Sequence, residues 1–142
     1  MGAKGSRVTY FDGSYYEGEV NARKKEHGKG RIHYANGDLL EGTFEDGDCT
    51  FAIITKKNGD SYEGNMRDHK YHGQGILKTK NYTESGLFRD NRFVHGKITY
   101  PDGSSYEGSI EGGAKNGKGI YISKEGTRYE GHLKNDKYDG KG

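Results

Sequence analysis

The side chains of this sequence that could carry acid–base or metal chemistry are histidines and carboxylates. His27 and His72 precede Gly-x-Gly motifs at matching places, and the full set of histidines is 27, 33, 69, 72, 95 and 132. One glutamate position also recurs and could supply paired carboxylates for catalysis; its members are Glu17, Glu41, Glu63, Glu107 and Glu130. Recurrence at regular spacing favours a structural role instead. We therefore expect no catalytic residue and no metal site, and we expect each glutamate to accept a hydrogen bond from a loop N–H near Gly-x-Gly.

A glycine-rich stretch and a single cysteine are the other candidates for cofactor chemistry. Gly112 and the pair Gly117-Lys118 have the spacing of a phosphate-binding P-loop, but Gly119 stands where that loop requires Ser or Thr. No strand-to-helix pattern surrounds this stretch. Cys49 is the one cysteine, which excludes an internal disulfide and a cysteine-based zinc site and favours a reducing, cytoplasmic compartment. The sequence predicts no bound cofactor.

Two features could bring the chain to a membrane. The residues from Met1 to Ser6 fit the N-myristoylation pattern, in which Gly2 would carry the acyl chain. Two basic clusters could contact anionic lipid headgroups; the candidate lipid-binding residues are Arg23, Lys24, Lys25, Lys56 and Lys57. The alternative is that these are ordinary solvated charges, because the chain carries 23 basic and 21 acidic residues. This interspersed balance, with a net charge of +2, also disfavours a nucleic-acid partner.

An internal repeat positions all of these residues. Glycines 18, 42, 64, 86, 108 and 131 are separated by 24, 22, 22, 22 and 23 residues. Two residues before them the chain has Tyr16, Leu40, Tyr62, Glu84, Tyr106 and Tyr129, and two residues after them Val20, Phe44, Met66, Phe88, Ile110 and Leu133. Since side chains alternate along a strand, these large residues and the glycines share one face, and the recurrent glutamate lies on the other.

Each copy of the repeat predicts two strands joined by a tight turn. Asx-Gly pairs such as Asp12-Gly13 precede the glycine-anchored strand and predict type I′ hairpin turns. After that strand we expect a longer polar loop that closes with Gly-x-Gly, as at Gly73 and Gly75. Two copies lack this closure, and the residues at the corresponding places are Phe51 and Ile53 in one copy and His95 and Lys97 in the other.

The pattern resembles the MORN (membrane occupation and recognition nexus) repeat. The resemblance is carried by Tyr62-Glu63-Gly64, a polar loop with His72-Gly73-Gln74-Gly75, and a strand that ends in an Asx-Gly turn. It extends from about residue 8 to 142, with departures around Phe51 and Glu84. We expect an all-β protein, an elongated single-sheet solenoid of about six successive β-hairpins, with residues 1–7 as a tail and 8–142 as the array. At two strand spacings per hairpin, such an array is a rod of roughly 55–60 Å.

The composition agrees with many tight turns and short aromatic strands. Only 29% of the 142 residues are hydrophobic and the mean hydropathy is −1.13, which on their own would favour disorder. However, 25 Gly and 12 Tyr are far too many for a solvated tail. No apolar run approaches the ~20 residues of a membrane span. The array has partial units at both ends, and its end strands carry no recognisable cap. We therefore expect either that it is part of a longer array or that its ends pair with partner molecules, including end-to-end pairing with another copy.

We interpret the chain as a non-catalytic protein-interaction scaffold that binds a helix or an extended segment. The predicted partner-binding residues are aromatics expected to be exposed, Tyr34, Tyr71, Phe93, Tyr100, Tyr121 and Tyr138. The resemblance implies a place in a cytoskeletal, ciliary or flagellar, or membrane-junction assembly. It also implies two alternatives. The chain would be a peripheral membrane module for acidic phospholipids, or an accessory region of a larger lipid kinase or lysine methyltransferase.

Overall fold

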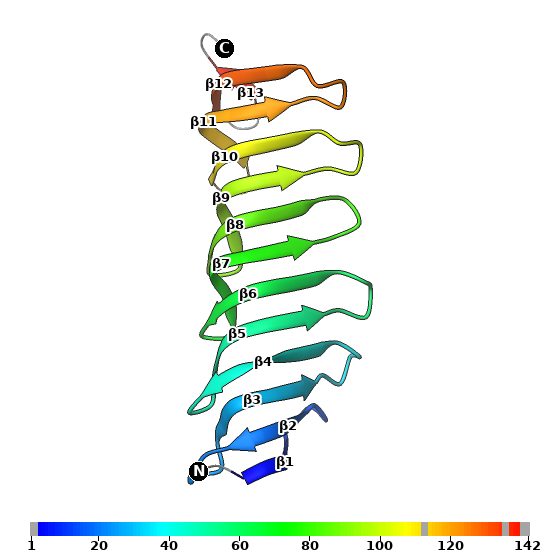
Figure 1. Ribbon diagram of the computed structural model, residues 1–142, viewed down its shortest axis with the longest axis vertical. Coiled ribbons are helices and arrows are strands. Elements are labelled where there is room, and N and C mark those ends of the chain that lie inside the picture. Colours follow the sequence, from blue (N-terminus) through cyan, green and yellow to red (C-terminus); the bar gives the residue numbers. More distant parts are fainter. Residues whose placement is uncertain (1–2, 112–113, 135–136, 140–142) are drawn as a thin grey trace.

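The protein is an open, single-layer antiparallel sheet. The computed structural model describes residues 3–111, 114–134 and 137–139. Within them, thirteen strands stack in chain order along one axis (Figure 1). Their bounds are β1 (Ala3–Thr9), β2 (Tyr15–Val20), β3 (Glu26–His33), β4 (Leu39–Glu45), β5 (Asp48–Thr55), β6 (Ser61–Arg67), β7 (Lys70–Lys78), β8 (Thr83–Arg89), β9 (Arg92–Thr99), β10 (Ser105–Glu111), β11 (Ala114–Ile122), β12 (Arg128–Lys134) and β13 (Lys137–Asp139). The prediction of an elongated all-β solenoid of successive hairpins is confirmed.

The first strand begins earlier than the sequence predicts. β1 pairs with β2 from Ala3 opposite Val20 to Thr9 opposite Tyr15. The boundary expected at residue 8, between a tail and the array, therefore falls inside a strand. The start of β1 is polar and lacks apolar alternation, so its side chains give no strand signal. It is held by pairing with the backbone of β2.

Except at β7–β8, where the Thr79 N–H donates to the Tyr82 carbonyl at 2.8 Å, the turns from odd to even strands are three-residue loops and not type I′ turns. In the first, the Gly13 N–H donates to the Tyr10 carbonyl at 3.2 Å and the Tyr10 N–H donates to the Ser14 carbonyl at 2.8 Å. Gly13 has a φ of +91°, whereas Asp12 is not among the residues with positive φ. This is a type I turn closed by one left-handed glycine, a common alternative for three-residue hairpin loops. The predicted turn position was therefore right and the predicted turn type wrong.

Three of the connections from even to odd strands are tighter than predicted, whereas β2 and β3 are joined by the longer segment 21–25. Asp46-Gly47, Asp68-His69 and Asp90-Asn91 each form a two-residue turn with positive φ at both positions, the type I′ pattern. Strand pairing runs up to these turns, for example between Arg67 and Lys70. The predicted long loop is therefore wrong here, and the Gly-x-Gly motif lies within the strand, as in β7. Asn and Asp tolerate the left-handed conformation, which is why the turns at Asp68-His69 and Asp90-Asn91 form without the Asx-Gly signature that Asp46-Gly47 has.

Buried side chains occupy one face of the sheet, as the repeat predicts. Tyr16, Tyr62 and Tyr106 have exposed fractions of 0%, and Phe44 and Phe88 of 3% and 1%. Together with Ile and other residues from the odd strands they form one continuous hydrophobic cluster. We call the row that contains the three tyrosines the core row. A sheet of one layer has no second layer to cover it, so these large residues bury one another along this face.

Each core-row tyrosine needs a glycine on the neighbouring strand because its ring lies over that backbone. A Cβ atom on Gly75 would lie 2.4 Å from the hydroxyl oxygen of Tyr62 and 2.6 Å from a ring carbon. Gly75 stands opposite Gly64 on the paired strand. The Tyr62 hydroxyl continues past both glycines and donates to the Asn65 carbonyl at 2.7 Å. The requirement at Gly75 is one of space, since no positive φ is recorded there.

The third copy differs from the prediction by one residue. Ala52, and not Phe51 or Ile53, stands opposite Gly42 on one side and Gly64 on the other. The segment between Gly42 and Ala52 is shorter than the corresponding segments of the neighbouring copies. Counting at fixed spacing therefore shifts the predicted register of β5 and exchanges the inner and outer faces of its side chains. Phe51 and Ile53 lie on the outer face, with exposed fractions of 38% and 43%. Ala52 fits because the core row here holds a leucine, which is smaller than a tyrosine.

The fourth copy is corrected in the same way. Gly96, and not His95 or Lys97, stands opposite Gly86. The core row holds Glu84 here instead of a tyrosine. A Cβ atom on Gly96 would lie 2.9 Å from the ring of Phe93, so this neighbouring side chain covers the glycine in place of the missing ring. The departure at Glu84 therefore leaves the packing of the sheet intact.

Candidate functional site

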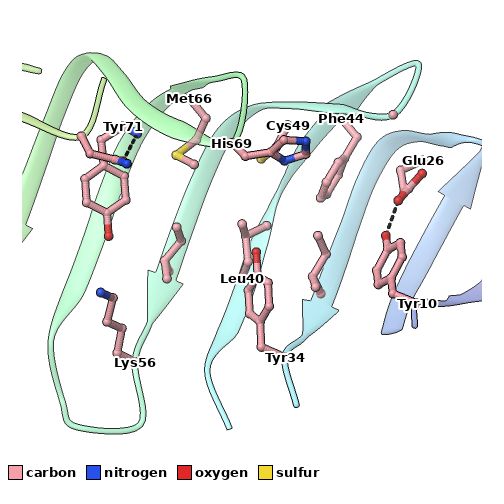
Figure 2. Close-up of a pocket in the computed structure, with 14 residues that line it drawn as sticks. Tyr10, Glu26, Tyr34, Leu40, Phe44, Cys49, Lys56, Met66, His69 and Tyr71 are labelled. Carbon is pink, nitrogen blue, oxygen red and sulfur yellow. Dashed lines mark hydrogen bonds between the residues drawn. The ribbon is translucent and has the colours of Figure 1, made fainter. Parts of the chain in front are cut away.

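The core face is hollowed into a groove. The register shifts just after the anchor glycine in each pair formed by an even strand and the following odd strand, from β2–β3 to β10–β11. Each shift marks a β-bulge. Bulges bend the strand and increase its twist. One hollow on this face, which we call the N-terminal groove, lies over β3 to β7, reaches Tyr10 at one end and Asn91 at the other, and has a volume of about 530 Å³. Figure 2 shows it with Leu40 in the floor, Tyr34 and Lys56 on one side, and Phe44 and His69 on the other.

Hydrogen bonds between successive turns hold the two sides of the groove. The Nδ1 atom of His27 accepts the N–H of Asp46 at 3.1 Å, and Nδ1 of His72 accepts the N–H of Asp90 at 3.3 Å. Each histidine thus joins its own strand to the turn of the next hairpin. This confirms the structural interpretation of the matching His-Gly-x-Gly positions. On the other side, the N–H of Ala35 donates to the Ser14 hydroxyl at 3.0 Å.

Polar groups in the N-terminal groove are few and mostly engaged. At one end the Tyr10 hydroxyl donates to the Glu26 carboxylate, as Figure 2 shows. Burial, followed by this hydrogen bond, raises the pKa of Tyr10 well above its ordinary value. Burial also raises the pKa of the Tyr34 hydroxyl and raises the pKa of the Cys49 thiol to about 11. All three groups therefore stay neutral near pH 7, and Lys56 supplies the cation on this wall.

Tyr71 extends the core towards the opening of the groove. Its ring stacks on Tyr62 at a centroid distance of 3.8 Å and an interplanar angle of 4°, and meets Phe88 edge-on at 6.0 Å. The Tyr71 N–H donates to the Asn91 side chain at 2.9 Å. Tyr71 therefore presents an aromatic surface that is already fixed in place, and a partner would not have to order it.

A second hollow continues the groove. This C-terminal groove has a volume of about 750 Å³ and shares Asn91 with the first. Its lining includes Leu77, Phe93, Ile98, Tyr100 and Glu84. The ammonium group of Lys115 lies 5.4 Å from the centre of the Tyr100 ring. Tyr100 also lines a shallower hollow with Tyr121, so the concave surface runs from β1 to β11.

The structure brings four of the six predicted partner-binding aromatics into these two grooves. Tyr34 and Tyr71 line the N-terminal groove, and Phe93 and Tyr100 line the C-terminal groove. Tyr34, Tyr71, Tyr100 and Tyr121 are half-buried and not exposed as predicted. Phe93 was also predicted to be exposed, which is wrong, because only 6% of it is exposed. It replaces the missing core-row ring described above. Tyr121 lies beside Tyr100, and the side chain of Tyr138 lies outside the described residues.

The candidate lipid-binding residues do not form one surface. One cluster, Arg23, Lys24 and Lys25, lies in or beside the β2–β3 turn. The other, Lys56 and Lys57, follows β5 and lies where the opposite ends of the strands are connected. Arg23 also lies 4.0 Å from the Asp46 carboxylate, and a hydrogen bond from the Asn21 amide, with Lys25 and Arg23 nearby, lowers the pKa of that carboxyl. Gly2 lies outside the described residues. The geometry gives no continuous basic patch from these five side chains.

The recurrent glutamates lie on the outer face, as the repeat predicts, but their expected hydrogen bonds are wrong. Glu17 contacts the Nε2 atom of His33 at 3.0 Å, and Glu41 pairs with Arg31 at 3.2 Å. These partners are exposed or half-exposed side chains of neighbouring strands. Instead, the carboxylate of Glu19 accepts a hydrogen bond near Gly-x-Gly, from the Lys29 N–H at 2.9 Å.

Potential metal ligands do not cluster in the described part of the chain. Within it, no group of three or more His, Cys, Asp or Glu side chains could hold a metal ion. It also contains no helix long and apolar enough to cross a membrane. What the arrangement can do chemically is bind a surface by apolar and aromatic contact. Sequence reasoning missed Tyr10, Leu77 and Glu84 as groove residues, although Glu84 was visible as a break in the repeat.

Comparison with known families agrees with the repeat. The MORN repeat family matches residues 16–39, 62–84, 85–105, 106–128 and 129–142. The unmatched stretch between the first two coincides with the copy that holds Leu40 and Ala52, and the fourth copy is matched despite Glu84. Every matched segment is a repeat, with no catalytic domain among them, and no curated protein matches the chain. Because these matches cover well over half of its residues, the chain belongs to the MORN repeat family.

Proposed function

We propose that this MORN repeat protein is a non-catalytic protein-interaction scaffold whose groove holds an elongated segment of a partner. The observation that carries the proposal is the concave surface shared by the two grooves, where four predicted aromatics meet. Its floor carries apolar side chains along both grooves, and in the N-terminal groove most polar groups are paired within the protein. Such a surface favours partners that bring apolar side chains.

An amphipathic helix suits this groove better than an extended strand. The floor is the interior of a sheet, where the backbone N–H and C=O groups are already paired with neighbouring strands. A strand laid there would leave its own backbone groups without partners, whereas a helix satisfies them internally. Apolar residues at helical spacing would then enter the hollows between the aromatic side chains.

The same geometry makes a protein a better-supported partner than an anionic membrane. The two basic clusters lie at opposite ends of the strands, and the charge of one of them is partly neutralised by the Asp46 carboxylate. A cytoplasmic setting agrees with the buried thiol of Cys49. The family supports a cytoskeletal, ciliary or membrane-associated assembly as the place of work, either alone or as an accessory region of a larger enzyme.

Two adjacent residues allow a matched test. Tyr100 lines the C-terminal groove, whereas Thr99 is exposed at the end of β9 and faces outward. The intact chain, Tyr100→Glu and Thr99→Glu are immobilised and incubated with native lysate, and captured proteins are identified by mass spectrometry. We expect proteins that are retained by the intact chain and by Thr99→Glu to be lost from Tyr100→Glu.

Identical captured proteins on all three surfaces would contradict the groove as the binding site. Loss from Thr99→Glu alone would place binding on the outer face. A parallel flotation with vesicles containing phosphatidylserine tests the membrane alternative. Flotation that is abolished by charge reversal at Lys24 and Lys25, with no groove-dependent protein, would replace the proposal with a lipid-binding module.

A further inference from the structure

Glu84 interrupts the core row with a carboxylate. The corresponding residues of the neighbouring copies are Tyr62 and Tyr106, both fully buried. Glu84 stands between Leu77 and Ile98 on the paired strands, and it lines the C-terminal groove. The acid thus lies at the centre of an otherwise apolar row, on the face that we propose as the binding surface.

This carboxylate has no partner among the described residues. Glu84 is half-buried and makes no hydrogen bond or ion pair there, and burial raises its pKa above the ordinary value of 4.5. Two cations also line the groove, but in the described residues neither forms an ion pair with Glu84. Arg92 is exposed next to the β8–β9 turn, and the Lys115 ammonium lies over the ring of Tyr100.

The fold does not require an acid at this place. The ring of Phe93 already covers Gly96, so a leucine in the core row, as at Leu40, would serve the packing. A partly desolvated carboxylate without a partner costs stability. Residues that reduce stability in this way are typical of binding sites, where the missing partner comes from the ligand.

We infer that Glu84 receives a basic side chain, arginine or lysine, from the helix bound in the groove, and that this pairing selects the partner. The inference rests on the proposed function and adds the chemistry of the recognised segment: an apolar face that contains one cation. A bound helix would exclude water from the pair, and charge-assisted hydrogen bonds strengthen in such surroundings. A partner without the cation would leave the Glu84 carboxylate buried and unpaired, which disfavours it.

The test is a peptide selection with a matched control. Random 16-residue peptides displayed on phage are selected in parallel on the intact chain, on Glu84→Gln and on Glu107→Gln. Glu107 is an exposed glutamate of β10 on the outer face, so its change alters the same charge outside the groove. Selected peptides are then tested on Tyr100→Glu, and circular dichroism verifies that every variant is folded.

We expect groove-dependent peptides to carry Arg or Lys at one fixed position. This enrichment should persist on Glu107→Gln and disappear on Glu84→Gln. Replacing that arginine by citrulline in a synthetic peptide should weaken binding to the intact chain roughly tenfold and leave binding to Glu84→Gln unchanged.

The outcomes separate this inference from the proposed function. Peptides that are lost on Tyr100→Glu but show no basic preference, or show the same preference on Glu84→Gln, would overturn the role of Glu84 and leave the groove as the binding site. Peptides that bind Tyr100→Glu as well as the intact chain would overturn both. The absence of any groove-dependent peptide would count against both as well.

Discussion

The pairing of a core-row tyrosine with a facing glycine makes a strong prediction at Gly75. Gly75→Ala places a Cβ atom 2.4–2.7 Å from the hydroxyl and ring of Tyr62, so the ring must move. Moving it weakens the stack on Tyr71, the edge contact with Phe88 and the hydrogen bond to Asn65. Ring contacts of this kind contribute roughly 0.5–1.5 kcal/mol and the hydrogen bond about 1 kcal/mol. We expect Gly75→Ala to lower the free energy of unfolding by about 2 kcal/mol, which includes the small gain of alanine over glycine in a strand.

The third copy supplies the compensating change, because it has Leu40 and Ala52 where the next copy has Tyr62 and Gly75. Tyr62→Leu alone loses the ring contacts, which costs about 2–3 kcal/mol. In the double variant the clash is absent, so the second substitution should add almost nothing. We expect the two changes to be non-additive by at least about 1.5 kcal/mol, measured by urea unfolding followed by far-ultraviolet circular dichroism.

Gly59→Ala is the matched control for this double-mutant cycle. A Cβ atom on Gly59 meets nothing within 4 Å, but its φ of +98° strains an alanine. This variant should therefore lose about 1 kcal/mol without any coupling to Tyr62→Leu. Costs that add within about 0.5 kcal/mol for Gly75→Ala and Tyr62→Leu would refute the argument that space beneath the ring makes glycine necessary.

Three further predictions concern single side chains. Burial raises the pKa of the Glu84 carboxyl above 4.5. Its protonated form therefore contributes to stability below pH 4.5, and this contribution is lost as the pH rises through the raised pKa. Glu84→Gln should have the same Tm as the intact chain at pH 4 and a higher Tm at pH 7, and equal Tm values at both pH values would contradict this. The Cys49 side chain is 5% exposed, and burial raises the pKa of its thiol to about 11. Iodoacetamide at pH 8 should therefore alkylate Cys49 slowly in the folded chain and rapidly in urea. Equal alkylation rates would place the thiol at the surface. His72→Ala removes the acceptor for the Asp90 N–H and should cost about 1 kcal/mol; hydrogen exchange followed by NMR should accelerate at Asp90, and an unchanged rate would show that the bond does not hold the turn.

The faces of the side chains next to each anchor glycine could be predicted from the sequence because they depend on local spacing alone. Tyr16, Gly18 and Val20 lie at period two, and any strand places such residues on one face. The same argument placed Glu17 on the outer face correctly. Its partner could not be predicted, because His33 lies on another strand and reaches it only through pairing. Contacts across strands depend on register, which no single strand encodes.

Register and turn type failed for a related reason. Between Gly42 and Ala52 the chain is shorter than between Gly64 and Gly75, although both connections contain a two-residue turn. A smaller register shift at the bulge accounts for the difference. Fixed counting therefore placed Phe51 and Ile53 at the wrong positions. The type of such a turn can be assigned only when both of its central residues are known to have positive φ. Asp and Asn adopt this conformation but do not require it, so their presence in the sequence does not assign the turn type.

Residues that build the groove and residues that hold the sheet together are largely the same. Tyr71 and Phe93 line the two hollows, yet each also packs against a core ring. Aromatic positions that fit the repeat therefore say little about which partner is bound, because the fold alone accounts for them. Selectivity should lie where the repeat is broken and the fold does not dictate the residue. In the described residues of the groove floor Glu84 is such a position, since its neighbour Phe93 provides the packing that a tyrosine provides elsewhere.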